Sequence, residues 1–251
     1  YGDTIQFARF VPQVKALGGR VVLECQPELA GLMRSAGADE VVAKGDALPE
    51  FDLQAPLLSA PYLLGADWDT LPADCPYLSP PEVPESERLV PPRPPGTKLM
   101  AGICWAGKPS QKNDRNRTMG LAPLARLAAI PGVRLVSLQK GPRSQDLDEL
   151  GMRPLVLDPT NRLKDFSDTA RLMQQLDVVV TVCTSVAHLA GALGVPTWVL
   201  LSDVADWRWL KEREDSPWYS TARLFRQQRL GEWGPPVNQA ARELAALAGS
   251  R

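Results

Sequence analysis

The stretch DVVVTVCTSVAHLAGALGVPTW, residues 177–198, predicts a buried strand, a Thr-Ser turn, an amphipathic helix that Gly194 closes, and a second strand. A helix that begins directly after a strand directs its free backbone N–H groups and the positive end of its dipole toward the carboxyl end of that strand. Open α/β sheets bind phosphorylated ligands at that place. The stretch therefore predicts a parallel sheet with an anion site at one edge.

His188 is the only histidine of the chain and lies in the first turn of this predicted helix. It falls off the apolar stripe, so we expect it to face the crevice with a neutral ring. The alternative is that Thr184 and Ser185 are ordinary helix caps and His188 is a surface residue. Spacing alone leaves both interpretations open. The apolar stripe consists of Val186, Leu189, Ala190 and Leu193.

Composition indicates a globular protein, with 44% hydrophobic and 23% charged residues among 251. We expect no membrane span, since no apolar run approaches the length that one needs, and no secretory leader opens the sequence. The four cysteines are far apart and form no C-x-x-C pair, which argues against a zinc site or a disulfide framework. We therefore expect a reducing, cytoplasmic location.

Charge and proline content divide the chain. Residues 1–97 carry 7 Lys or Arg against 14 Asp or Glu, whereas residues 98–251 carry 21 against 15. This asymmetry favours an anionic ligand in the second part and is too mild to indicate nucleic acid. Nine prolines fall between Pro72 and Gly96, which predicts an extended, semi-rigid linker without helix or central strand.

Strands and helices alternate on both sides of this linker, which predicts two Rossmann-like α/β lobes that face a cleft. Besides the helix that Gly194 closes, the expected helices span residues 4–17, 27–35, 122–129, 145–150, 165–175 and 237–248. Besides the buried strand before the Thr-Ser turn, the expected strands span residues 20–25, 40–43, 53–57, 99–105, 133–138, 154–157, 197–201 and 223–225. No strand precedes the first helix, so we expect the first lobe to lack its opening strand.

Three further clusters follow predicted strands. The loop 106–118 carries four basic residues, of which Lys112, Arg115 and Arg117 are candidates for binding phosphate. Gln139 and Lys140 leave the next strand, where they could meet a base or sugar hydroxyl and a phosphate. Residues 203–219 are rich in tryptophan and charge, which suits stacking against a sugar or base. A solvated loop and a covered core edge are the alternatives for the first and third clusters.

Several familiar signatures are absent from the sequence. It holds no G-x-G-x-x-G, no P-loop and no G-x-S-x-G, which argues against nicotinamide or flavin enzymes, the usual NTPases and α/β-hydrolases. With one histidine and no clustered carboxylates, we expect neither a metal site nor a cofactor.

Five motifs together resemble a known family. They are GDTIQFARF (residues 2–10), WAG (105–107), NDRNR (113–117), SLQKG (137–141) and TSVAHLAGALG (184–194). In this order, across nearly the whole chain, they resemble the C-terminal glycosyltransferase module of bacterial tetratricopeptide-repeat proteins, which is related to the ADP-heptose lipopolysaccharide heptosyltransferases. The resemblance implies a GT-B fold and inverting sugar transfer from a nucleotide-sugar donor without metal.

The resemblance also implies roles for single residues. Asp3 matches the acidic residue of the N-terminal Gly-Asp motif, the proposed general base. Thr184, Ser185 and His188 match the motif that binds the donor diphosphate. Cys183 stands where the family usually has an Asp that touches the donor sugar. Further candidates for binding the donor phosphates are Lys112, Arg115, Arg117, Gln139 and Lys140; candidates for contact with the sugar or base are Trp105, Cys183, Asp206 and Trp207.

The sequence thus predicts an acceptor-side lobe over residues 1–71, a linker over 72–97 and a nucleotide-sugar lobe over 98–234. A terminal helix over 235–251 is expected to pack back on the first lobe. The expected partners are the donor, a protein or glycan acceptor and upstream tetratricopeptide repeats in the same chain, with no nucleic acid. Two alternatives stay open: an inactive nucleotide-sugar-binding scaffold, and a lipopolysaccharide heptosyltransferase.

Overall fold

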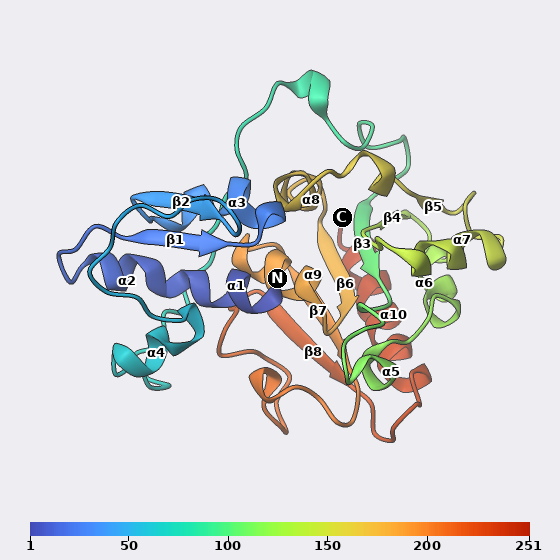
Figure 1. Ribbon diagram of the computed structural model, residues 1–251. Helices are drawn as coiled ribbons and strands as arrows, with labels where there is room; N and C mark the ends of the chain where they lie inside the picture. Colours follow the sequence, from blue (N-terminus) through green and yellow to red (C-terminus); the bar gives the residue numbers. More distant parts are fainter.

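A six-stranded parallel sheet forms the centre of the computed structural model, which describes residues 1–251 apart from the side chain of Glu85 (Figure 1). The strand order is β5-β4-β3-β6-β7-β8, so the direction of winding reverses between β3 and β6. That reversal is the topological switch point at which open sheets of this kind bind ligands. The strands are β3 (Leu99–Cys104), β4 (Val133–Ser137), β5 (Val156–Leu157), β6 (Val178–Val182), β7 (Thr197–Leu201) and β8 (Ala222–Arg226).

Helices cover both faces of this sheet, which explains why the central strands β3 and β6 are buried along their whole length. Successive side chains of a strand point to opposite faces. Met100 and Cys104 pack on one side, with helices α8 (Phe166–Met173) and α9 (Ser185–Ala192). Leu99, Ala101 and Ile103 pack on the other. The helices of that second side are α6 (Ala125–Ala128), α7 (Asp146–Glu149) and α10 (Gly234–Gly249), while α5 (Asp114–Arg117) lies in the loop after β3.

The first part of the chain builds a smaller unit around a two-stranded parallel sheet. The predicted helix over residues 4–17 is divided at Ala8–Phe10, just before Pro12, which has no N–H to continue the helical hydrogen bonds. The elements are α1 (Gly2–Phe7), α2 (Val11–Lys15), β1 (Val22–Cys25), α3 (Pro27–Met33), β2 (Glu40–Ala43) and α4 (Ala60–Leu63).

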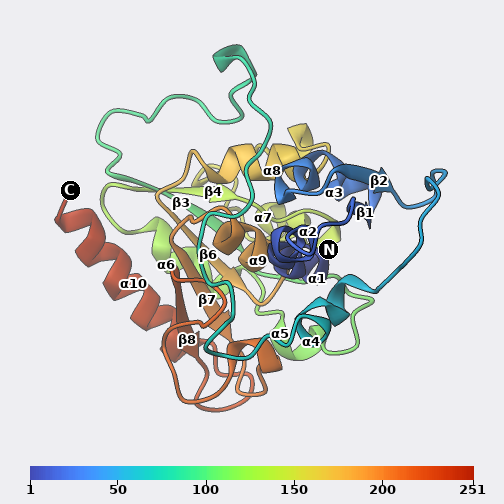
Figure 2. The ribbon, with the colours of Figure 1, turned by 90° about the vertical axis from the view of Figure 1, so that its left-hand side faces the viewer.

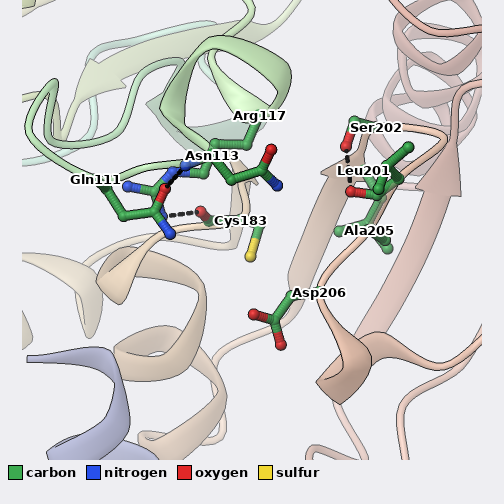
Figure 3. Close-up of a pocket in the computed structure, with 9 residues that line it drawn as sticks. Gln111, Asn113, Arg117, Cys183, Leu201, Ser202, Ala205 and Asp206 are labelled. Carbon is green, nitrogen blue, oxygen red and sulfur yellow. Dashed lines mark hydrogen bonds between the residues drawn. The ribbon is translucent and has the colours of Figure 1, made fainter.

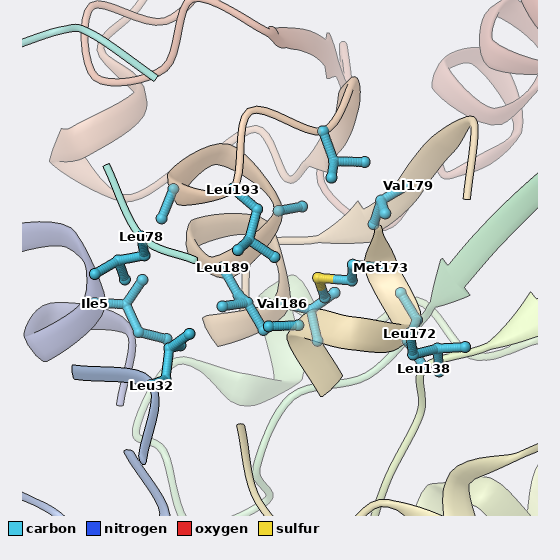
Figure 4. Close-up of a cluster of buried hydrophobic side chains, with 14 of the residues drawn as sticks. Ile5, Leu32, Leu78, Leu138, Leu172, Met173, Val179, Val186, Leu189 and Leu193 are labelled. Carbon is cyan, nitrogen blue, oxygen red and sulfur yellow. The ribbon is translucent and has the colours of Figure 1, made fainter. Parts of the chain in front are cut away.

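Two hydrophobic clusters join this unit to the six-stranded sheet, and Figure 4 shows the larger of them. Ile5 and Leu32 from the first part meet Val186 and Leu189 of α9 (Figure 4). The proline-rich stretch adds Leu78 to the same cluster, and the N–H groups of Tyr77 and Leu78 donate to Ala192 O at 3.0 and 3.2 Å. The stretch therefore packs at the carboxyl end of α9 as it passes between the two sheets.

Two further elements differ from the sequence prediction. The strand expected over residues 53–57 does not form; Pro49 and Pro56 flank an exposed segment there, and Leu53 is 91% exposed. Helix α10 packs against the six-stranded sheet and α6, on the side of the molecule away from the first lobe (Figure 2). The expectation that it returns to the first lobe is therefore wrong: its apolar side chains Val237, Ala240 and Leu244 complete the second face of the large sheet.

Candidate functional site

The carboxyl ends of β3 and β6 lie side by side at the switch point, and Arg117 joins the loops that leave them. Its Nη1 donates to the carbonyl of Cys183 at 3.0 Å, and its Nε donates to Asp114 Oδ1 at 3.2 Å. A Cβ atom on Gly107 would lie 2.4 Å from Arg117 Nη2, so glycine lets the guanidinium pass close to the backbone. Arg117 thus fixes the geometry of the crevice.

A small pocket opens at this point (Figure 3). Arg117 and Cys183 form one side, and Asp206 lies across from them on the loop after β7. The enclosed space is about 30 Å³, roughly the volume of one water molecule. The pocket marks where three strand-end loops converge. Its lining residues are Gln111, Asn113, Arg117, Cys183, Leu201, Ser202, Val204, Ala205 and Asp206.

Helix α9 begins at the floor of the crevice, as the sequence predicts. Thr184 is its N-cap, and its Oγ1 accepts a hydrogen bond from Val186 N at 3.2 Å. The Thr184 hydroxyl is buried and lies 3.5 Å from the hydroxyl of Thr181, so it serves the helix itself. Ser185 follows at the first helical position and is half-buried.

His188 is 6% exposed and packs against the first part of the chain. Its Nδ1 lies 2.8 Å from Tyr219 Oη, and its ring stacks on Trp209 at 5.4 Å between ring centroids. A Cβ atom on Gly2 would lie 2.9 Å from His188 Cδ2. The expectation that His188 faces an open crevice is therefore wrong, because the start of α1 covers the ring. The glycine of the Gly-Asp motif permits this close contact.

Burial also decides the charge of His188. Desolvation lowers its pKa to about 3, and the nearby Arg208 guanidinium acts in the same direction. The ring is neutral, as the sequence predicts. The main physical cause is its enclosure between α1, Trp209 and Tyr219, whereas the sequence pointed to the helix dipole.

Arg208 brings Asp3 to the edge of the pocket. Its Nη2 donates to Asp3 Oδ1 at 2.7 Å, its Nη1 to Asp206 Oδ1 at 2.9 Å and its Nε to Gln6 Oε1 at 2.6 Å. The Arg208 side chain is largely buried, whereas the Asp3 side chain is 56% exposed. One guanidinium therefore orients two carboxylates and leaves Asp3 open to solvent. Sequence reasoning did not select Arg208, whose only signal was its place beside Asp206 and Trp207.

Cys183 is held by an aromatic partner. Its Sγ accepts a hydrogen bond from Trp209 Nε1 at 3.1 Å. Desolvation raises the pKa of the thiol, so the group is neutral at pH 7. The position that carries an Asp in the resembling family is thus occupied here by a neutral side chain bonded to an indole.

Two predicted contact residues are internal. Trp105 is fully buried and donates from Nε1 to Asp146 Oδ2 at 2.9 Å, which removes it from the crevice. Gln139 is also buried: its Oε1 accepts from Trp105 N at 3.1 Å and from Ala106 N at 2.9 Å. These interactions hold the chain as it leaves β3, so the expectation of donor contacts from Trp105 and from the Gln139 side chain is wrong.

The remaining candidates lie at the rim. Lys112 and Arg115 are exposed on the loop after β3. Lys140 is exposed along its stem but donates from Nζ to the carbonyl of Leu163, away from the pocket. Trp207 is 55% exposed, with the Arg208 guanidinium 4.6 Å from its ring centroid. Among the predicted phosphate-binding cations, Lys112 and Arg115 therefore remain accessible to a ligand.

Across the described part of the chain, no three His, Cys, Asp or Glu residues gather as a group that could hold a metal ion. Nor does any described helix have the length and apolar character needed to cross a membrane.

Comparison with solved structures identifies the fold. An ADP-heptose lipopolysaccharide heptosyltransferase II from E. coli matches with a TM-score of 0.62 and 13% identity, over 99% of this chain and 96% of the other. The chain has the heptosyltransferase fold. The E. coli heptosyltransferase WaaC with ADP gives a TM-score of 0.57 at 12% identity, over 100% and 96% of the two chains. The predicted α/β class with the two-lobed GT-B architecture is confirmed.

Sequence comparison finds a longer relative. The chain is 28% identical over 280 residues to protein FlbA of Caulobacter vibrioides, covering 99% of this chain and 45% of FlbA. The chain thus spans less than half the length of that relative. No family model matches the sequence.

Proposed function

We propose that the chain is a metal-independent, inverting glycosyltransferase that moves a sugar from a nucleotide-sugar donor to a hydroxyl of a protein or glycan. One observation carries the proposal: Arg208 connects Asp3, on the first helix, to Asp206, at the switch point of the large sheet. A carboxylate from one lobe thus reaches the ligand edge of the other. The heptosyltransferase fold agrees with this arrangement.

The donor side is formed by the amino end of α9 and the rim of the loop after β3. The first N–H groups of a helix and its dipole favour an anion. Ser185 opens α9, and the exposed Lys112 and Arg115 add positive charge on the facing loop. This combination suits the diphosphate of a nucleotide sugar. ADP is the nucleotide named with the structurally similar WaaC.

In the proposed reaction, the Asp3 carboxylate accepts the proton of the acceptor hydroxyl as its oxygen attacks the anomeric carbon. A carbon–oxygen bond forms on one face of the sugar, and the bond to the donor diphosphate breaks on the other. The leaving nucleoside diphosphate takes the electron pair, and the start of α9 stabilises its charge. Attack from the opposite face inverts the anomeric configuration. Arg208 positions Asp3 for this step.

A non-catalytic nucleotide-sugar-binding module is the second candidate, and one observation favours it. Cys183 is neutral and already bonded to Trp209, so it cannot supply the carboxylate contact that the resembling family makes to its donor sugar. The third candidate, a lipopolysaccharide heptosyltransferase, would select ADP-heptose. The acidic first lobe disfavours this candidate, because its negative charge would be repelled by an anionic lipid surface.

The setting of the reaction is part of the proposal. All four cysteines are free thiols, which supports a reducing, cytoplasmic location. The match to 45% of FlbA supports a longer protein, for which we propose tetratricopeptide repeats in the same chain.

A donor panel tests the proposal. The melting temperature and the release of free nucleotide are measured with UDP, GDP, ADP and CMP and with their sugars. A ligand at about 100 times its Kd stabilises the fold by about 2.7 kcal/mol. We expect one nucleotide series to raise the melting temperature and its sugar to be consumed. A shift without consumption, with acceptors supplied, identifies the binding module; no shift with any nucleotide overturns the donor site.

A further inference from the structure

Residues 46–69, here called the acidic apolar segment, expose an unusual amount of apolar surface. The segment runs from the end of β2 through α4, whose buried Ala60 belongs to the same hydrophobic cluster as side chains of β7 and β8 (Figure 1). Of the fourteen exposed large apolar side chains in the described structure, seven lie here. Leu53 is 91% exposed, Tyr62 87% and Trp68 57%. Exposed apolar side chains gathered in one short segment favour an interaction site.

Charge on the segment has one sign. Five carboxylates, and neither Lys nor Arg, occur within residues 46–69, and all five acids are exposed: Asp46, Glu50, Asp52, Asp67 and Asp69. Two of them, Glu50 and Asp52, flank the exposed Phe51, so the loop presents an aromatic side chain between two carboxylates. This arrangement suits a partner in which cations stand next to an apolar side chain.

The segment is continuous with the candidate site through tryptophan contacts. Trp68 lies edge-on to the buried Trp218 at 6.1 Å between ring centroids, and Trp207 lies edge-on to the same ring at 6.0 Å. Trp207 in turn stacks with Arg208, which holds Asp3. An occupant of the segment can thus extend toward Asp3 along exposed indole surface.

We propose that the acidic apolar segment docks a polypeptide that carries Lys or Arg next to large apolar side chains. The charge complementarity favours such a partner over a glycan, which has no cations to pair with the five carboxylates. A second copy of this chain is disfavoured, because a twofold contact would place two segments of net charge −5 against each other. The inference does not depend on sugar transfer.

A displayed library of random short peptides, selected on the purified chain, tests the proposal. Enriched peptides are then synthesised, and their Kd is measured by fluorescence anisotropy without any nucleotide. We expect a net positive charge and large apolar residues among them, and an affinity that falls as salt rises. Enrichment of neutral or acidic peptides, or no enrichment, would overturn the proposal.

Matched variants locate the binding. Leu53→Ser with Tyr62→Ser, and separately Glu50→Lys with Asp52→Lys, should each weaken peptide binding at least about tenfold, the scale of an interface hot spot. Leu155→Ser and Glu149→Lys alter exposed residues near β5 and should leave the Kd unchanged. Equal weakening by the segment variants and by the control variants would contradict the proposal. So would a dimer of wild type that the double variant Leu53→Ser with Tyr62→Ser dissociates, because the partner would then be a second copy of this chain. Because no donor is present, the result is independent of glycosyltransferase activity.

Discussion

At the scale of single residues, the contact between Gly2 and His188 links the first and the last of the five motifs, which lie far apart in the sequence. The sequence indicated that Asp3 and His188 both belong to a site. It could not show that His188 lies behind α1, because burial of a residue off the apolar stripe of its own helix depends on what a distant segment places over it. Arg208 was missed for the same reason: its partners Asp3 and Gln6 are some two hundred positions away.

Replacing Gly2 with alanine should destabilise the fold by about 1–3 kcal/mol, the usual cost of an overpacked contact. The new Cβ would lie 2.9 Å from the His188 ring, which Trp209 and Tyr219 prevent from moving away. Urea unfolding measures the loss. Gly19→Ala is the control, because nothing lies within 4 Å of a Cβ there. Equal stability of Gly2→Ala and wild type would contradict the packing.

The buried His188 predicts a loss of stability in acid. The unfolded chain protonates this residue near its ordinary pKa of about 6.5, whereas the folded chain does so only near about 3. Between these values the unfolded state binds one more proton. The free energy of unfolding therefore decreases as pH falls, by up to about 1.4 kcal/mol per pH unit from this residue. Urea unfolding from about pH 4 to pH 7 should show a weaker dependence in His188→Gln; an unchanged slope would exclude this role.

At the scale of elements, hydrophobic periodicity predicted the buried strands and α9 well, because local pattern determines them. It failed at residues 53–57, where two prolines flank the segment and the apolar side chain of Leu53 is exposed. The contact roles predicted for Trp105 and Gln139 were wrong for a different reason. Residues at a strand end can face the crevice or hold the loop behind it, and only the neighbouring strand decides which.

Gln139→Met should destabilise the loop after β3, because it leaves the buried N–H groups of Trp105 and Ala106 without their acceptor. An unsatisfied buried donor costs about 1–3 kcal/mol. Hydrogen exchange of these two amides should accelerate, and urea unfolding should show the loss of stability. Gln145→Met changes an exposed glutamine in the following segment and serves as control. If the amides of Trp105 and Ala106 exchange as slowly in Gln139→Met as in wild type, Gln139 does not support this loop.

At the scale of the whole molecule, two hydrophobic clusters contain residues of both the first lobe and the large sheet, so we expect the two sheets to unfold together. Ile5 is fully buried where α1 meets α9. Ile5→Ala should cost about 2–5 kcal/mol of unfolding free energy. It should lower the melting temperature of one single transition that fluorescence and circular dichroism both report. Two transitions, with the later one unchanged by the substitution, would show that the large sheet is stable without the first lobe.

The central claim is that Asp3 acts on an acceptor at a donor site built by the other lobe. The most direct measurement is the rate of sugar transfer by Asp3→Asn, compared with wild type, together with the nucleotide-dependent melting shift of both proteins. Loss of a general base costs about 10²–10⁴-fold in rate. We therefore expect Asp3→Asn to transfer sugar more slowly by this factor and to keep the wild-type melting shift with nucleotide. A variant that transfers sugar at the wild-type rate, with the same shift, would contradict the account.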